Sequence, residues 1–164
     1  MRKKIALFFL ALSQVLCLSP LVQAASFSDV PESGAHYDAI AYLADYGILE
    51  GYSDSSFKPD ASINRAELLK VLVLSFAPQP DSTKYRNCYP DVLNDWYAPY
   101  VCYATEKGWV EGYSDGLFRP GTSVNKVESV KMLIHAAGLE TDLPEASETP
   151  FSDTNSTQWY APYL

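Results

Sequence analysis

Two basic side chains at matching positions are the residues best suited to chemistry in this chain. Arg65 directly follows Asn64, and each sits where a helix is predicted to begin. Lys126 directly follows Asn125 in the same way. A cation there faces the positive end of the helix dipole, at a cost of roughly 0.3 kcal/mol or more. Backbone N–H groups at a helix start also bind anions. Because the unfavourable placement occurs twice, we interpret Arg65 and Lys126 as anion contacts.

Each cation is positioned by a helix start with the same capping pattern. Asn64 is followed three residues later by Glu67, and Asn125 by Glu128, which is a capping-box spacing. The simplest role of both glutamates is therefore structural. Apolar residues at helical spacing follow and predict the buried faces: Leu68, Leu69, Leu72 and Phe76 in the first helix, and Val127, Val130, Leu133, Ile134 and Ala137 in the second.

The two helices belong to two copies of one sequence repeat. Residues 51–59 read GYSDSSFKP, and residues 112–120 read GYSDGLFRP. A third copy begins at residue 151 and breaks off at residue 164. Self-similarity at a fixed period predicts tandem units that cover one another's apolar faces.

Each unit predicts a helix, a turn and a second helix, so the fold is expected to be mainly α. The first helices are predicted from about Tyr37 and about Tyr97, with Gly47 and Gly108 as left-handed helix ends. The GYSD segment holds too many turn formers for a helix, which indicates short extended pieces around a tight turn. Its single aspartate is expected to bond its own turn, since a calcium loop needs several spaced oxygens.

The first residues are an export signal. Arg2 to Lys4 precede an apolar run of about 14 residues, which is short for a membrane span, and small residues before position 25 favour cleavage after Ala24. We therefore expect a secreted protein with no membrane insertion after cleavage. The predicted segments are a signal peptide (1–24), repeat 1 (25–76), a linker (77–88), repeat 2 (89–138), a linker (139–150) and the start of a truncated repeat 3 (151–164).

The net charge of the chain excludes some classes of binding partner. The chain has 12 basic and 20 acidic residues, and loss of the three basic residues in the signal leaves a net charge near −11. Such a balance argues against nucleic acid and anionic membranes as partners.

Two cysteines, Cys88 and Cys102, remain in the exported part. In an oxidising compartment they are expected to form a disulfide, worth about 3 kcal/mol for a loop of about 15 residues. Two sulfurs without a nearby histidine are too few ligands for a metal site.

Aromatic residues gather near the turns and helix starts, namely Tyr52, Trp96, Tyr97, Trp109 and Tyr113. Most aromatics in a small repeat belong to the core, but a minority beside a groove could stack on sugar rings while a cation takes an acid group.

The repeated pattern resembles the S-layer homology module of bacterial surface proteins. The shared motif runs from Phe/Tyr-x-Asp-Val through GYSD-x-x-F-x-P to Ile/Val-Asn-Arg/Lys-x-Glu. The resemblance implies a pseudo-threefold, mainly helical unit that binds secondary cell-wall polysaccharide, often with pyruvate ketals. Its groove residues here would be Arg65, Lys126, Gly51, Tyr52, Gly112, Tyr113 and Trp96.

The sequence departs from that pattern at two functional positions. Asn64 and Asn125 replace a threonine, which keeps the cap but changes any hydroxyl contact. Lys126 replaces an arginine and loses the bidentate grip on a carboxylate, so repeat 2 is expected to bind more weakly.

The leading functional hypothesis is noncovalent anchoring of an exported protein to the cell envelope through an acidic cell-wall polysaccharide. The first alternative is a structural module that contacts surface-layer or other proteins without a glycan. The second is an envelope glycosidase with two carboxylates. Because caps and turns explain the acids at matching positions, we expect no catalysis and no cofactor.

Overall fold

The structure, a computed structural model, describes residues 26–139 and 151–164. Its elements are four α-helices and one short 3-10 helix: α1 (Tyr37–Asp45), α2 (Arg65–Phe76), α3 (Ala98–Glu106), α4 (Lys126–Ala136) and η2 (Ala161–Tyr163). Within these ranges the extended pieces amount to two isolated bridges, Asn64 with Ser123 and Tyr89 with Val92. The fold is mainly α, as predicted. The expected signal peptide and all but residue 139 of the second linker lie outside the described residues.

Local sequence signals explain where the helices begin and end. The side chains of Asn64 and Asn125 accept from the N–H three residues on, and the glutamates at those positions accept from the asparagine N–H. Both capping boxes are therefore formed. Gly47 and Gly108 follow α1 and α3 with φ of 68° and 73°, values that glycine adopts without the steric cost of a Cβ.

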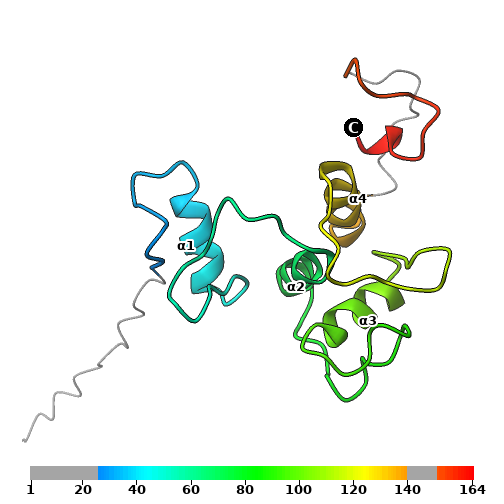
Figure 1. The fold of residues 1–164 in the computed structure, drawn as a ribbon, viewed down its shortest axis with the longest axis horizontal. Helices are drawn as coiled ribbons and strands as arrows, with labels where there is room; N and C mark the ends of the chain where they lie inside the picture. Colours follow the sequence, from blue (N-terminus) through cyan, green and yellow to red (C-terminus); the bar gives the residue numbers. More distant parts are fainter. Residues whose placement is uncertain (1–25, 140–150) are drawn as a thin grey trace, which may run out of the picture.

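Three helices pack into one body, and α1 lies to one side of it (Figure 1). α2 packs against α3 and α4, and α4 also contacts η2. In the α2–α3 and α4–η2 contacts, the first helical segment of one repeat packs on the second helix of the preceding repeat. The described residues thus form a tandem arrangement, in which the second helix of each repeat contacts the repeat that follows it.

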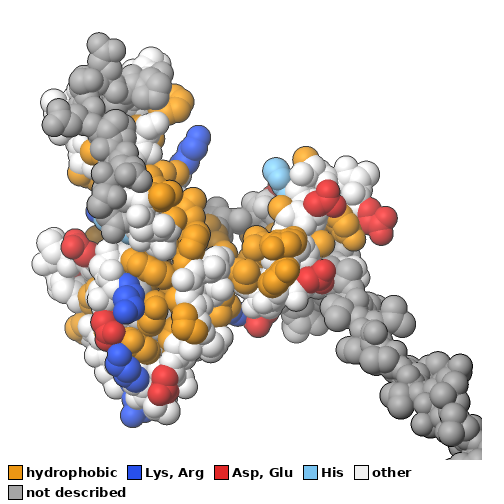
Figure 2. All heavy atoms as spheres, turned by 180° about the vertical axis from the view of Figure 1, so that it is seen from behind, with side chains coloured by type: hydrophobic (Ala, Val, Ile, Leu, Met, Phe, Trp, Pro, Cys, Tyr) orange, Lys and Arg blue, Asp and Glu red, His pale blue; other side chains and the backbone are white. Residues whose placement is uncertain are grey.

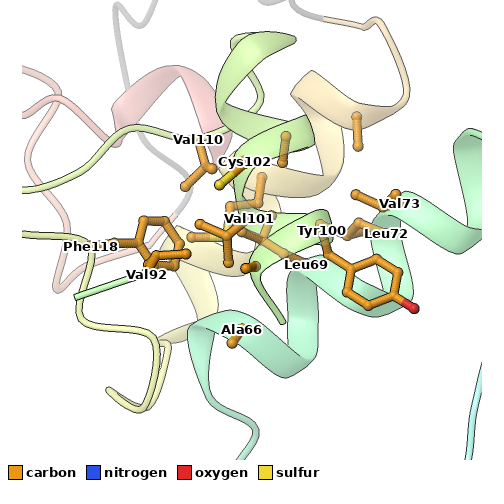
Figure 3. Close-up of a cluster of buried hydrophobic side chains, with 14 residues drawn as sticks. Ala66, Leu69, Leu72, Val73, Val92, Tyr100, Val101, Cys102, Val110 and Phe118 are labelled. Carbon is orange, nitrogen blue, oxygen red and sulfur yellow. The ribbon is translucent and has the colours of Figure 1, made fainter. Parts of the chain in front are cut away.

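The core lies between α2, α3 and the turn of repeat 2 (Figure 3). Leu69, Val101 and Phe118 are fully buried there. The predicted stripe is correct at Leu69 and Leu72, but wrong at Phe76, which is exposed. On α4 the prediction is also wrong at Leu133: the buried residues are Met132 and Ala136, because this face meets the neighbouring elements.

A disulfide joins the first linker to α3. Cys88 and Cys102 are bonded, with 5.5 Å between their Cα atoms. Tyr85, from the same linker, packs edge-on against Tyr103 of α3, with ring centroids 5.3 Å apart. The linker is thus fixed to the helix of repeat 2. Repeat 1 has Ala41 where repeat 2 has Cys102, so its first helix has no such staple.

Hydrophobic side chains also appear on the surface of both parts of the molecule (Figure 2). Tyr42 of α1 and Tyr46, which directly follows this helix, are 59% and 68% exposed and lie with ring centroids 4.7 Å apart. None of the helices in the described ranges has the length and apolar character needed to cross a membrane.

Candidate functional site

Two equivalent grooves lie beside the repeated turns. Groove 1, of about 640 Å³, is formed by the turn of repeat 1, α2 and one side chain of repeat 2, and its lining includes Glu50, Gly51, Tyr52, Lys58, Lys70 and Trp96. Groove 2, of about 310 Å³, is formed by the turn of repeat 2, α4 and one side chain of repeat 3, and its lining includes Arg65, Glu111, Gly112, Tyr113, Lys131 and Trp159. Each groove therefore combines two successive repeats, and groove 2 also receives Arg65 from the repeat before.

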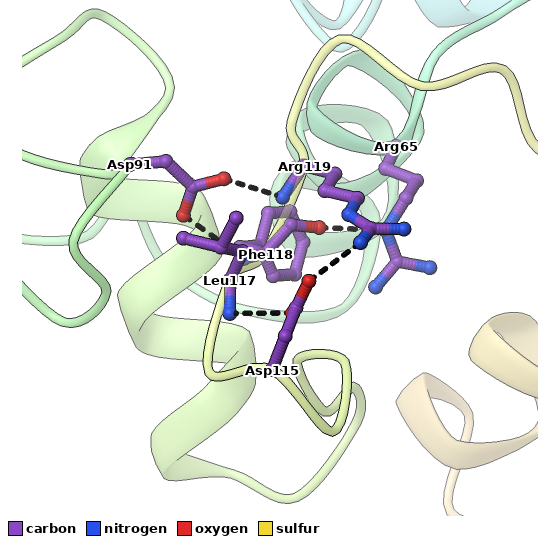
Figure 4. A network of polar contacts seen from close by, with 6 residues as sticks. All are labelled: Arg65, Asp91, Asp115, Leu117, Phe118 and Arg119. Atoms are coloured by element: carbon purple, nitrogen blue, oxygen red, sulfur yellow. Dashed lines mark hydrogen bonds and ion pairs between the residues drawn. The ribbon is translucent and has the colours of Figure 1, made fainter.

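Arg65 is the buried cation of groove 2, with 5% of its surface exposed. Its Nε donates to the carbonyl oxygen of Phe118 over 3.2 Å, and its Nη2 donates to that of Glu111 over 3.0 Å. Its guanidinium lies over the rings of Tyr113 and Phe118, 5.0 and 4.6 Å from their centroids. Figure 4 shows this guanidinium beside the turn of repeat 2.

No carboxylate within the described ranges forms an ion pair with Arg65. Its partners are neutral carbonyls, although buried charges in proteins are usually paired with an opposite charge. The partners of the Arg65 charge within the described ranges are thus carbonyl dipoles and the faces of two aromatic rings.

The backbone at the start of α2 is not available, which corrects the expectation of free N–H groups there. The N–H of Arg65 donates to the carbonyl of Thr122 over 3.0 Å, and that of Ala66 donates to Pro120 over 3.1 Å. Repeat 2 covers this helix end because its residues 119–124 run across it, including the bridge between Ser123 and Asn64. Of the two contacts expected at this helix start, only that of the Arg65 side chain remains possible, because these two backbone N–H groups already have acceptors.

Lys126 occupies the matching position of α4 but lines neither groove. Its side chain is exposed. In the part of the chain that the structure describes, no carbonyl accepts from its N–H, and no turn lies over α4 as residues 119–124 lie over α2. Lys126 was interpreted as an anion contact in a groove, but the structure places it outside both grooves.

Gly51 and Gly112 do shape their grooves, through a steric requirement. A Cβ on Gly51 would lie 2.4 Å from the Phe27 ring, and one on Gly112 would lie 2.5 Å from the Tyr89 ring. Both distances are too short for any real side chain. The glycines let the aromatic residue that opens each repeat pack against the turn.

A repeated aspartate, which sequence reasoning left without a role, fixes each turn. Asp29 accepts from the N–H groups of Phe57 and Lys58, both over 2.7 Å. Asp91 accepts in the same way from Phe118 and Arg119, over 2.9 and 2.7 Å (Figure 4). The hydrogen bond from Phe57, with that from Lys58, lowers the pKa of Asp29 below its usual value.

The turns also contain their own hydrogen bonds. Asp54 accepts from the N–H of Ser56, and Asp115 accepts from that of Leu117, so the prediction of aspartates that bond their own turns is confirmed. The Ser56 hydroxyl is the main cause that lowers the pKa of Asp54, and the Leu117 N–H does so for Asp115.

A second pair of groove cations was missed. Lys70 of α2 and Lys131 of α4 lie 5.9 and 5.4 Å from the ring centroids of Trp96 and Trp159, respectively. Both tryptophans are more than half exposed. The signal was present in the sequence, because Lys131 follows Lys70 at the same 61-residue interval that separates the paired glycines. Trp96 was expected as a stacking surface, and its exposed ring does border groove 1.

Comparison with known proteins identifies the class. The family model described as S-layer homology domain matches residues 26–69 and 89–128, which together are half of the chain. The chain belongs to the S-layer homology domain family.

Similar proteins include the S-layer protein sap of Bacillus anthracis, 26% identical over 145 residues, which cover 87% of this chain and 17% of that protein. A cellulosome-anchoring protein of Acetivibrio thermocellus is 28% identical over 137 residues, with 82% and 30% covered. The middle cell wall protein of Brevibacillus brevis is 28% identical over 145 residues, with 84% and 14% covered. The chain therefore spans less than a third of the length of these relatives. Their names describe surface and anchoring proteins rather than enzymes.

Proposed function

We propose that this chain anchors an exported protein noncovalently to the bacterial cell envelope, by binding an acidic cell-wall polysaccharide in groove 2. The observation that carries the proposal is Arg65, a buried cation whose partners within the described ranges are neutral carbonyls. A carboxylate of the ligand would supply the missing negative charge. The protein as a whole is acidic, with 12 basic and 20 acidic residues. An anionic ligand would therefore be attracted by a few basic side chains near the groove and not by the net charge of the protein.

The rest of groove 2 suits a sugar that carries an acid group. Trp159 is 54% exposed, and the Lys131 Nζ lies over one face of its ring, 5.4 Å from the centroid. Lys131 forms no ion pair within the described ranges. A sugar ring could stack on Trp159 while its acid group meets Lys131 and Arg65. Pyruvylated sugars fit this description, as do uronic acids.

The relatives favour the envelope as the place of action, since they are surface-layer, cell-wall and anchoring proteins. The second candidate, a module that contacts surface-layer proteins without a glycan, is favoured by the exposed pair of Tyr42 and Tyr46 at the end of α1. The two candidates differ in what the chain binds on a purified wall.

The experiment is cosedimentation of the purified protein with bacterial cell walls in three states. The walls are intact, stripped of their acid-labile polysaccharide, or intact but with the acid groups of that polymer removed. Binding to intact walls alone is the expected result. Equal binding to intact and stripped walls would contradict glycan anchoring and favour a protein or peptidoglycan partner.

A further inference from the structure

The start of repeat 3 contains a short segment that lines neither groove and has a chemistry of its own. Residues 153–157 read DTNST, so an asparagine is followed two residues later by a threonine, with serine between them. Asn-x-Ser/Thr, with any residue but proline in the middle, is the acceptor pattern of N-glycosylation. The second residue after each of the other four asparagines of the sequence is alanine, tyrosine, tryptophan or valine, at Asn64, Asn87, Asn94 and Asn125. Asn155 is therefore the one asparagine of the sequence that fits the pattern.

The structure places this asparagine in a turn at the surface. Asn155 and Thr157 are both exposed. The Asn155 Oδ1 accepts from the N–H and from the hydroxyl of Thr157, both over 2.9 Å. The oxygen of the amide thus holds the turn. Its nitrogen, Nδ2, is the atom that N-glycosylation modifies, and it takes no part in these two bonds.

Two other turns of the chain have the same hydrogen bonds without an amide group. Asp54 accepts from the N–H and the hydroxyl of Ser56, over 3.0 and 2.6 Å. Asp81 accepts from those of Thr83, over 2.8 and 2.7 Å. A carboxylate oxygen therefore makes the same two bonds as the Asn155 oxygen. What the asparagine adds to such a turn is the Nδ2 group, which an N-linked sugar requires.

We propose that Asn155 is an N-glycosylation site, which an oligosaccharide transferase modifies during export of the chain. The donor is an oligosaccharide joined through pyrophosphate to a membrane lipid. The Asn155 Nδ2 forms a bond to C1 of the first sugar, while the bond between C1 and the pyrophosphate oxygen breaks. The lipid pyrophosphate leaves with the electron pair of that bond, and one amide proton passes to a base of the transferase. The reaction needs no oxidant or reductant.

The surroundings of Asn155 suit such a modification. The protein is secreted to the cell surface, and N-linked sugars are bulky, solubilising groups on surface loops of secreted proteins. Phe151 and Trp159, four residues before and after Asn155, are 48% and 54% exposed. A hydrophilic oligosaccharide between these two side chains would make this part of the surface more soluble. The inference depends on export of the chain and not on the ligand of groove 2.

Mass spectrometry of the protein purified from the surface of the producing bacterium tests the site. Trypsin cleaves after Lys131, and no lysine or arginine follows up to residue 164, so Asn155 lies in one long peptide. Electron-transfer fragmentation of that peptide assigns an added sugar mass to a single residue. Asn155 is expected to carry the sugar. An unmodified peptide would overturn the inference, and so would a sugar located on a serine or a threonine.

Variants at two neighbouring positions test the acceptor pattern itself. Thr157→Ala keeps Asn155 but removes the hydroxyl that the transferase recognises, so the modified fraction should fall at least about a hundredfold. Thr157→Ser keeps a hydroxyl and should remain modified. Ser156→Ala is the matched control, because it removes a neighbouring hydroxyl that is not part of the pattern, and it should remain modified too. Modification that persists in Thr157→Ala, or that is lost in Ser156→Ala, would contradict the assignment.

Discussion

α2 and α4 begin with the same arrangement of residues, yet their first side chains have different surroundings. Both have an asparagine cap, a basic first residue and a glutamate that closes the capping box. Arg65 is nevertheless buried under the turn of repeat 2, whereas Lys126 is exposed. Within the described residues, the basic residue that residues 119–124 cover lines a groove, and the basic residue without such a cover lines none.

The largest expected effect comes from removing the buried cation. Arg65→Met keeps much of the volume but leaves the carbonyls of Phe118 and Glu111 without their donor, so it should lower the free energy of unfolding by about 3 to 4 kcal/mol. Lys126→Met should change it by less than about 0.5 kcal/mol. Urea unfolding followed by circular dichroism measures both. Similar losses of stability in the two variants would contradict the claim that Arg65 is held in place by repeat 2 and that Lys126 is not.

The next effect concerns α3, which packs on α2 and is fixed by the disulfide. The double variant Cys88→Ser with Cys102→Ser should lose about 3 kcal/mol, because the unfolded chain is no longer closed into a loop. Thermal unfolding of the variant, compared with the wild type under oxidising and reducing conditions, checks this. If the reduced wild type matched the oxidised one, the disulfide would contribute nothing to the stability of the protein.

Removal of the asparagine caps should destabilise the protein by different amounts at α2 and at α4. Asn64 is partly buried and covered by repeat 2, whereas Asn125 is exposed. We expect Asn64→Ala to cost about 1.5 kcal/mol and Asn125→Ala about 0.7 kcal/mol, since loss of a cap ranges around 1 kcal/mol and is larger when the freed donor is buried. Serine at each position should restore most of the loss. A greater cost at Asn125 would contradict the observed covering of α2.

The smallest effect is a dependence on acid. The pKa values of Asp29, Asp54 and Asp115 are lowered from 3.8 by hydrogen bonds, so their contribution is fully present above about pH 4 and is lost as the pH falls through the lowered values. The melting temperature should therefore fall below pH 4. In Asp29→Asn it should be lower at pH 6 but less sensitive to acid. An equally steep fall in this variant would rule out Asp29 as one of the groups responsible.

Much of the fold could be predicted from the sequence because its signals are local. The caps at Asn64 and Asn125 and the glycine at Gly47 depend on neighbouring residues alone, and so does the repeat itself. The exposure of Phe76 and Leu133 could not be predicted, because helical spacing gives an apolar stripe but not the elements that cover it.

The site was predictable only to the level of residue types. Arg65 and Trp96 were identified as groove residues, but the carbonyls that hold Arg65 come from residues about 50 positions away. The N–H groups of α2 were expected to be free because no local pattern shows that repeat 2 crosses the helix start. Lys70 and Lys131 were not identified as groove residues. A lysine that lies among core residues of a helix is ordinarily a solvated side chain, so neither one indicated a site by itself.

The most direct test of the central claim compares two lysines of the same helix. Isothermal titration with purified acidic cell-wall polysaccharide would measure the affinity of Lys131→Met, within groove 2, and of Lys126→Met, outside it. The two variants have the same net charge and leave Arg65 in place. We predict that Lys131→Met weakens binding about tenfold while Lys126→Met stays within twofold of the wild type. Equal affinities in the two variants would contradict the assignment of groove 2 as the anion site.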